Sequence, residues 1–198
     1  DVPAAVGLPA PAWILPVGGG LGYGRFELDA ATLEFLATRH HEIADPVLRG
    51  ASFVALWESM LEGGIAPARV LDQIVLSLPR ERDELNVQHL LDAARTTFWR
   101  FTAADDRAAA AVRLEPLMRA GLDRASTAGA KAAWFGALRS VATSPATVAW
   151  LERVWRRDVK IPGLPLAETD EADLALDLAV RDVPAAEGIL EMQRERFA

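Results

Sequence analysis

The sequence predicts an all-α protein of stacked antiparallel helical hairpins, and three observations support this class. Apolar residues recur every three or four positions from about residue 30 onward, which is the period of an α-helix. Prolines and capping residues divide these stretches into segments of about 10–20 residues joined by short loops. Short loops force neighbouring helices to run antiparallel, so we expect about nine helices in a HEAT-like α-solenoid. No repeat of fixed period is visible, so this architecture depends on the hydrophobic pattern alone.

Residues 1–28 differ in composition from the rest of the chain. They contain four prolines and six glycines, including the glycine-rich run 18–24. Short apolar runs on either side of such a turn are typical of strand–turn–strand or of extended chain. We therefore expect a lead-in over 1–28, either the tail of a preceding β domain or an extended segment. A helical domain over 29–198 should follow.

Capping signals define the first helices. Asp29 is a favourable N-cap and predicts a helix over 30–39. Asp45 and Pro46 open the next helix, which Gly63 and Gly64 end. This second helix is apolar on more than one side, so we expect it to pack between two layers. Its two stripes are Val47, Ala51, Val54 and Leu61 and, beside them, Phe53, Leu56 and Met60.

The middle of the chain has two further helical patterns. Pro67 opens a helix that Pro79 ends, and the acidic residues within 81–84 favour a new helix start. One regular apolar face then extends from residue 87 to residue 101. Its members are Val87, Leu90, Leu91, Ala94, Phe98 and Phe101.

Prolines also shape the second half of the chain. Thr102 is expected to cap a helix beginning at Asp105-Asp106, and Pro116 predicts a kink or a break within it. A loop over 158–168 contains Pro162, Gly163 and Pro165. Further helices are expected over 127–142, from Pro145 to the loop, around 170–181 and around 184–197, the last one opened by Pro184.

Composition excludes several classes of protein. The net charge is −7 and the pI is about 5.0, which argues against a binder of phosphate backbones, so we expect no nucleic-acid partner. The absence of cysteine excludes a disulfide framework, a thiolate metal site and a cysteine nucleophile. Apolar runs fall far short of the roughly 18 residues that a membrane helix needs, so no membrane segment is expected.

A few clusters could carry chemistry, and each has a simpler structural explanation. His40, His41 and Glu42 form a local cluster, but adjacent helical histidines point about 100° apart, whereas zinc ligands on a helix sit at i and i+4. A polar helix end is the favoured interpretation, and His89 is isolated. The glycine run 18–24 fits neither a dinucleotide-binding nor a P-loop pattern.

Acidic pairs and aromatic–basic pairs lead to the same conclusion. The carboxylates at 81–84 and 105–106 lie at predicted helix starts, where negative charge stabilises the helix dipole. The tryptophans and arginines of 150–157 could stack on nucleic acid, but an amphipathic helix with inward tryptophans is favoured. Neither GxSxG nor HExxH occurs. We therefore assign no catalytic, cofactor-binding or metal-binding residue.

Four segments carry a family resemblance. They read W-I-L-P-V-G-G-G-L-G-Y-G-R-F-E-L-D (13–29), D-P-V-L-R-G-A-S-F-V-A-L-W-E-S-M-L-E-G-G-I-A-P (45–67), L-P-R-E-R-D-E-L-N-V-Q-H-L-L (78–91) and I-P-G-L-P-L (161–166). Together they resemble the zinc aminopeptidase family that includes aminopeptidase N and puromycin-sensitive aminopeptidase. In that family a tryptophan-containing strand, a glycine turn and a tyrosine-containing strand lead into a helical C-terminal domain. Val17 is a departure, because many members have Asn there.

The resemblance implies a role without catalytic residues. In the family, HExxH and a downstream Glu bind the zinc, and a GxMEN loop reads the substrate's amino terminus; neither motif occurs here. The implied role is a C-terminal helical domain that packs on the catalytic domain of the same chain and limits which peptides enter the chamber above the zinc. The parent would remove N-terminal residues from peptides, with zinc activating water. This part alone would be inactive and bind no zinc above stray levels, and a cytoplasmic location is expected.

A second hypothesis is a stand-alone α-solenoid that serves as a protein-interaction module, because solenoids offer concave binding surfaces. The two hypotheses differ in surface character. A domain cut from an aminopeptidase should expose an apolar or mixed patch where other domains dock. A stand-alone solenoid should have polar caps at both ends.

Overall fold

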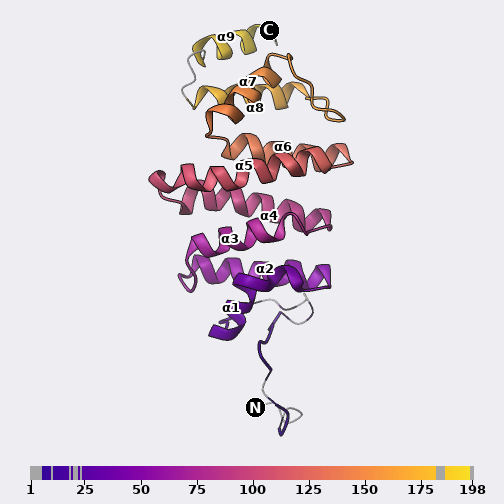
Figure 1. Cartoon of the computed structure of the whole chain (residues 1–198), viewed down its shortest axis with the longest axis vertical. Coiled ribbons are helices and arrows are strands. Elements are labelled where there is room, and N and C mark those ends of the chain that lie inside the picture. The colour runs from indigo at the N-terminus through magenta and orange to yellow at the C-terminus, as the bar shows by residue number, and fades with distance from the viewer. Residues whose placement is uncertain are drawn as a thin grey trace. The chain divides into compact units, whose positions relative to one another are not determined.

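The computed structural model of the chain is all-helical, which confirms the predicted class (Figure 1). The structure describes residues 6–9, 11–17, 19, 22, 24–181 and 186–196. Within these residues the chain forms nine α-helices and no β-strand. Contacts divide the chain into two compact units, Asp1–Asn86 and Val87–Ala198, and the boundary falls inside one helix, α4.

The first unit is built from three helices and the start of a fourth. Helix α1 packs against α2 and α3, and α2 also contacts α3. Asp29 caps α1 by accepting hydrogen bonds from the main-chain N–H groups of Ala31 and Thr32, and Asp45 caps α2 in the same way. The predicted helix starts are therefore confirmed. The elements are α1 (Ala30–Arg39), the 3₁₀ turn η3 (His40–Glu42), α2 (Pro46–Leu61), α3 (Pro67–Ser77) and the start of α4 (Glu84–Thr96).

Helix α2 does not pack between two layers, so that expectation is wrong. The stripe of Phe53, Leu56 and Met60 is buried, but Val47 and Leu61 are more than half exposed. The first stripe faces outward because α1 and α3 cover only one side of α2 within this unit. A second apolar stripe on a helix predicts that this face packs against something, but it does not show that another helix of the same unit packs there.

The second unit contains the remaining helices in sequence order. Helix α5 packs closely on α6, α8 contacts both α6 and α7, and α9 packs on α8. Thr127 and Ser144 cap α6 and α7 with their hydroxyl oxygens, as predicted for helix starts at these positions. Its elements after α4 are η4 (Thr97–Phe101), η5 (Ala104–Asp106), α5 (Arg107–Arg124), α6 (Ala128–Val141), α7 (Pro145–Trp155), α8 (Glu168–Ala179) and α9 (Ala186–Arg196).

The regular apolar face predicted from residue 87 to residue 101 ends early. Leu90, Ala94 and Phe98 are buried, but Phe101 is 38% exposed. The last turn, η4, is a π-helix, whose wider turn adds a residue and rotates Phe101 away from the face. The 3.6-residue period therefore holds only as far as Phe98.

Of the two expectations around α5, the Thr102 cap is wrong, and for Pro116 the structure contradicts the break. Thr102 does not cap the helix, because its hydroxyl donates to the Thr97 carbonyl, and a short 3₁₀ turn precedes the start of α5 at Arg107. Pro116 does not break α5, which runs through it. A proline removes one main-chain hydrogen bond, and the close packing of α5 on α6 holds the helix together across this gap.

In its described residues the lead-in has neither helix nor strand over 11–17, a turn at residues 6–7, and a hydrogen bond from the Gly22 N–H to the Val17 carbonyl at 2.9 Å. The Ile14 N–H donates to the Thr32 hydroxyl oxygen at 2.9 Å, and the same hydroxyl donates to the Ile14 carbonyl at 3.2 Å. The Trp13 ring stacks on the Phe35 ring with 4.2 Å between centroids. These contacts tie the segment to α1. Of the predicted glycine turn, Gly19, Gly22 and Gly24 are described, whereas Gly18, Gly20 and Tyr23 lie outside the described residues, as does the Pro184 helix start. The division at residue 28 stays a prediction.

The close contact of α5 with α6 gives a prediction for Gly121. A Cβ at this position would lie 2.4 Å from ring atoms of buried Trp134. Alanine favours a helix by about 1 kcal/mol over glycine, but the overlap should outweigh this. We expect Gly121→Ala to lower the free energy of unfolding by about 2 kcal/mol, measured by urea denaturation.

The matched control is Gly136→Ala on α6. A Cβ at Gly136 meets no described atom within 4 Å. This variant should be neutral or more stable by up to about 1 kcal/mol, because alanine has the higher helix propensity. Equal effects of the two substitutions would contradict the packing argument.

Candidate functional site

His40, the first of the two adjacent histidines, is a buried structural residue. Its Nε2 lies 2.7 Å from the Arg49 carbonyl oxygen, and its Nδ1 lies 3.3 Å from Ser77 Oγ. Because a carbonyl can only accept, Nε2 carries the proton and Nδ1 accepts from the hydroxyl. Gln73 Nε2 in turn donates to Ser77 Oγ at 2.8 Å. Both ring nitrogens of His40 are therefore occupied within the protein.

This environment predicts that stability depends on the charge of His40. Burial lowers the pKa of His40 from 6.5 to about 4; the hydrogen bond to the Arg49 carbonyl and the Glu81 carboxylate oppose this shift, and repulsion from Arg49 and His41 adds to it. The unfolded chain therefore takes up the proton at a higher pH than the folded chain. Stability should fall by about 3 kcal/mol in total as the pH drops from 6.5 to 4.

The measurement is urea denaturation across this pH range for the parent sequence and for His40→Gln. Glutamine can still donate and accept but carries no titrating group. Its profile should be flatter by the His40 contribution, whatever its absolute stability. The same slope in both proteins would show that His40 does not titrate as its surroundings indicate.

The other two histidines do not complete a metal site. His41 is half-buried in the 3₁₀ turn and His89 is exposed on α4. Across the described part of the chain, no three His, Asp or Glu side chains lie together in a way that could hold a metal ion.

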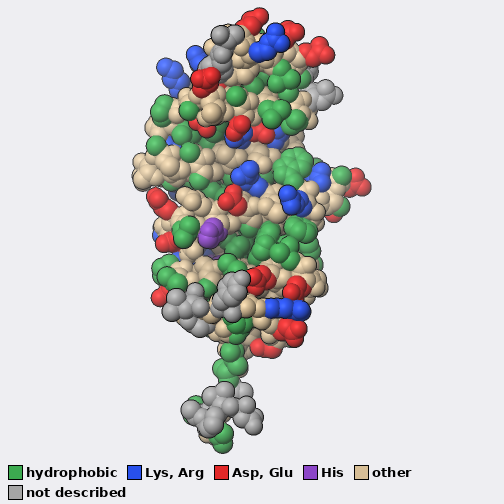
Figure 2. Space-filling model, turned by 180° about the vertical axis from the view of Figure 1, so that it is seen from behind, with side chains coloured by type: hydrophobic (Ala, Val, Ile, Leu, Met, Phe, Trp, Pro, Cys, Tyr) green, Lys and Arg blue, Asp and Glu red, His purple; other side chains and the backbone are tan. Residues whose placement is uncertain are grey.

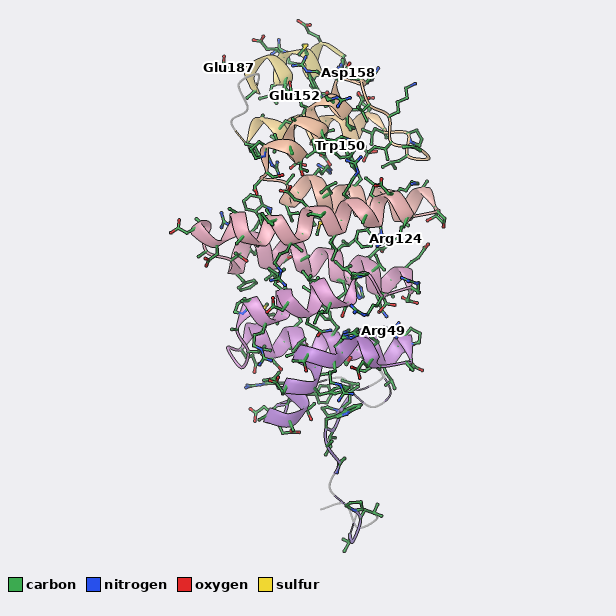
Figure 3. All side chains as sticks on the ribbon, viewed as in Figure 1. Arg49, Arg124, Trp150, Glu152, Asp158 and Glu187 are labelled. Carbon is green, nitrogen blue, oxygen red and sulfur yellow. The ribbon has the colours of Figure 1, made fainter. Side chains whose placement is uncertain are left out.

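A buried ion pair organises the polar interior of the first unit (Figure 3 labels Arg49 on α2). Arg49 Nε and Nη2 donate to the two Glu81 carboxylate oxygens at 2.6 and 2.7 Å. Glu81 also accepts from the main-chain N–H groups of Arg82 and Asp83. Asn86 Nδ2 donates to the Pro46 carbonyl at 2.9 Å. The network ties the start of α2 to the start of α4.

Glu81 of the 81–84 cluster has a pKa well below its ordinary value. Burial raises the pKa of Glu81, but the hydrogen bonds from Arg49, Asp83 and Arg82 outweigh it and bring the pKa down to about 2. A carboxyl that stays ionised and fully bonded cannot serve as a general acid. An open pocket of about 500 Å³ adjoins the cluster, lined by His41, Arg49, Arg80 and Glu81 among others. The cluster is a structural centre, not an acid–base site.

Glu115 of α5 is a buried carboxylate that the sequence did not single out. It accepts from the main-chain N–H groups of Thr143 and Ser144 at 2.7 and 2.9 Å and from the hydroxyls of Ser144 and Thr147. Burial raises the pKa of Glu115, but these hydrogen bonds outweigh it, so the pKa lies below its ordinary value. The carboxylate thus caps the N-terminus of α7 from another helix.

Arg181 plays the complementary part at the end of α6. Its guanidinium donates to the carbonyl oxygens of Arg139, Ser140 and Ala142, which lie at the C-terminal end of that helix. Positive charge at this end stabilises the helix dipole. Neither Glu115 nor Arg181 has a local sequence signal for its capping role, because the main-chain groups that each one caps lie about thirty or forty residues away, beyond the reach of any periodic pattern.

The tryptophans and arginines of 150–157 are engaged within the protein. Figure 3 labels Trp150 and Glu152 on α7 and Asp158 just beyond its end. Trp155 is fully buried and donates from Nε1 to Gln193 Oε1 at 2.7 Å. Arg156 pairs with Glu152 at 2.7 Å. The predicted amphipathic helix is confirmed. Figure 2 shows Lys and Arg side chains interspersed with Asp and Glu side chains on one face of the molecule.

The end of α7 holds an open pocket of about 540 Å³ in the second unit. Its lining combines apolar residues of the loop between α7 and α8 with three charged residues, Arg157, Lys160 and Glu171. Arg157 Nε and Nη2 donate to the two Glu171 oxygens at 2.9 and 2.8 Å. Arg157 is also the one non-glycine residue with positive φ in the described chain, at 66°. The sequence analysis treated this loop only as an interruption.

Comparison with models of known protein families and with curated protein sequences found no match. None of the helices in the described part of the chain has the length and apolar character needed to cross a membrane.

Proposed function

We propose that this chain is the non-catalytic C-terminal helical domain of a zinc aminopeptidase, which covers the active-site chamber and shapes peptide access. The main support is the resemblance of four sequence segments between residues 13 and 166 to the corresponding part of that family. The all-helical fold that follows the lead-in is the architecture that this role requires. In the parent, zinc would activate water for attack on the first peptide bond. This domain would act by sterically limiting entry.

Exposed apolar side chains on the lead-in and α2 favour this proposal over a stand-alone solenoid. Trp13 and Ile14 are 37% and 57% exposed, and Val47, Val54 and Leu61 on the outward stripe of α2 are exposed as well. A pocket of about 630 Å³ lies between the two, lined by Val17, Phe26, Val54 and Leu61 among others. Apolar surface of this kind is expected where a further domain packs, and a polar cap would not expose it.

The test is the intact mass of the native gene product in its source cell, with peptide mapping upstream of Asp1. We expect a product several times larger than 21.4 kDa, with HExxH and GxMEN-like peptides upstream. A product that begins near Asp1 would overturn the proposal in favour of a stand-alone interaction module.

A variant of the full-length product tests the role of α2. Val54→Asp places a charge on the outward stripe and should loosen domain packing, which would raise cleavage of long peptides relative to a dipeptide substrate. Val112→Asp is the matched control, because Val112 is 71% exposed on α5 in the second unit. Identical peptide-length profiles for both variants would argue against docking through α2.

A further inference from the structure

The pocket at the end of α7 has the size and walls of a small-molecule site. Its volume of about 540 Å³ falls within the range of roughly 300–1,000 Å³ typical of ligand pockets. The loop between α7 and α8 supplies most of the lining, and Figure 1 shows it as a narrow loop that projects beyond the helices. The apolar side chains of the lining are Val154, Val159, Ile161, Leu164 and Leu166.

Two local motifs hold this loop in shape. Ile161 to Leu164 form a tight turn, in which Leu164 N–H donates to the Ile161 carbonyl at 3.1 Å. Pro162 fixes the second position of the turn, and Gly163 supplies the positive φ of 74° that the third position of a type II turn needs. The buried Ile161 and Leu164 anchor the turn. The pocket wall is therefore largely preformed, which lowers the entropic cost of binding.

The second motif is the end of α7, where Arg157 takes a position that usually holds glycine. Its N–H donates to the Val154 carbonyl, and the Asp158 N–H donates to the Arg153 carbonyl, both at 3.0 Å. This is a Schellman motif, whose left-handed residue strains a side chain other than glycine. Such strain is characteristic of functional positions. Here the left-handed backbone of Arg157 places its guanidinium on the pocket wall.

The charges that line the pocket do not balance. Glu171 accepts both Nε and Nη2 of Arg157, and Arg196 lies 3.8 Å from the same carboxylate. The Arg157 Nη1 and the Lys160 ammonium make no hydrogen bond or ion pair with the described residues. Lys160 is exposed and is one of only two lysines in the chain. An apolar wall therefore adjoins unused positive donors, within a C-terminal region that is otherwise acidic.

We propose that this pocket binds a small carboxylic acid with a branched apolar group. The apolar group packs against Val154, Ile161 and Leu166, and the carboxylate accepts hydrogen bonds from Lys160 Nζ and Arg157 Nη1. Positive donors beside an apolar wall complement both parts of such a ligand. The inference goes beyond the proposed function and does not depend on it, because it concerns only residues of the second unit.

The first experiment compares two probes that differ only in charge. N-acetyl-L-leucine carries the apolar group and the carboxylate, and N-acetyl-L-leucinamide carries the same group without charge. Calorimetric titration should give a dissociation constant on the order of 1 mM for the acid, and binding of the amide should be at least about tenfold weaker. Equal binding of the two probes, or no saturation by the acid up to about 20 mM, would overturn the proposal.

The lysine content of the chain allows a direct structural readout. With ¹³C-labelled lysine, only Lys131 and Lys160 give side-chain signals. Lys131 Nζ donates to the Leu122 carbonyl and does not line the pocket. The Lys160 signal should move on addition of the acid in proportion to occupancy, with a smaller change at Lys131. Because the Lys131 side chain lies beside Gly163 of the turn, its signal can move as well; a Lys160 signal that does not saturate with the acid would contradict the site.

Variants separate binding from stability. Lys160→Ala should weaken binding of the acid at least about tenfold and bring it close to that of the amide. Arg157→Gly should weaken it similarly, because it removes the Nη1 donor and leaves the Glu171 carboxylate without its main partner, while glycine fits the left-handed backbone at this position. Arg153→Ala is the matched control, since it removes an exposed arginine of α7 that does not line the pocket. Unchanged affinity in both pocket variants would contradict the proposal.

Discussion

Replacing Glu81 by alanine is expected to lower the free energy of unfolding by about 4 kcal/mol. The Glu81 side chain is 1% exposed and that of Arg49 is 14% exposed, so the substitution leaves a guanidinium without its carboxylate in a poorly hydrated place. The main-chain N–H groups of Arg82 and Asp83 lose their acceptor as well. Urea denaturation at neutral pH measures the loss.

The control is Glu42→Ala, which breaks an ion pair in the same unit. Glu42 pairs with Arg39 at 2.6 Å, but both side chains are about half exposed to solvent, so the loss of stability should be much smaller than for Glu81→Ala. The double variant Arg49→Leu/Glu81→Leu should lose less stability than the summed losses of Arg49→Leu and Glu81→Leu, because it leaves no unpaired buried charge. Additive losses would show that the pair is not coupled as the geometry indicates.

Acid should weaken this network in a defined range. The folded-state pKa of Glu81 is about 2, below its ordinary value of 4.5, so its stabilising contribution is present above pH 4.5. It is lost as the pH falls from 4.5 towards 2, a range that overlaps only the lower end of the His40 titration. Glu81→Ala should remove this lower step and, because the Glu81 carboxylate raises the pKa of His40, should also enlarge the loss of stability at the His40 step.

Glu115→Ala is expected to cost about 3–4 kcal/mol, because a buried carboxylate that accepts four hydrogen bonds is removed. Two of its donors are main-chain N–H groups at the start of α7, which have no intrahelical partner. The loss should therefore weaken the attachment of α7 to α5. Hydrogen exchange of the Thr143 and Ser144 amides measures this locally, and urea denaturation measures it globally.

Glu152→Ala is the control within the same unit. Glu152 pairs with Arg156 along the surface of α7, so its loss should cost about 0.5 kcal/mol or less. In Glu115→Gln, an NH₂ group replaces one of the two acceptor oxygens and faces N–H and hydroxyl donors that it cannot accept from. This variant should therefore be nearly as unstable as the alanine variant. A Glu115→Ala protein with parent-like stability and unchanged exchange would contradict the capping role.

Helix boundaries could be predicted from the sequence because capping is local. Asp29, Asp45, Thr127 and Ser144 lie next to the helices that they cap, and their side chains reach the first main-chain N–H groups without tertiary contacts. Periodicity also predicted most buried positions of α4. It failed at Phe101, because a π-turn changes the period without a sequence signal.

The buried polar centres could not be predicted in the same way. His40 looked like a polar helix end, and its burial depends on Arg49 and Ser77, which arrive from other helices. No neighbour of Glu115 in the sequence indicates that it accepts hydrogen bonds from two main-chain N–H groups at the start of α7. A charged residue is stable in the interior only where distant partners meet it, so its sequence neighbours do not show its role.

The sequence by itself determined the all-α class, the helix starts at Asp29, Asp45 and Pro145, and the loop over 158–168, because caps, prolines and helical period act over a few residues. The tertiary structure decided which stripe of α2 is buried, where the ion pair of Arg49 forms, and that Arg157 adopts a left-handed backbone beside a pocket. These features depend on segments far apart in the chain meeting at van der Waals distance, and packing free energy outweighs local preference there.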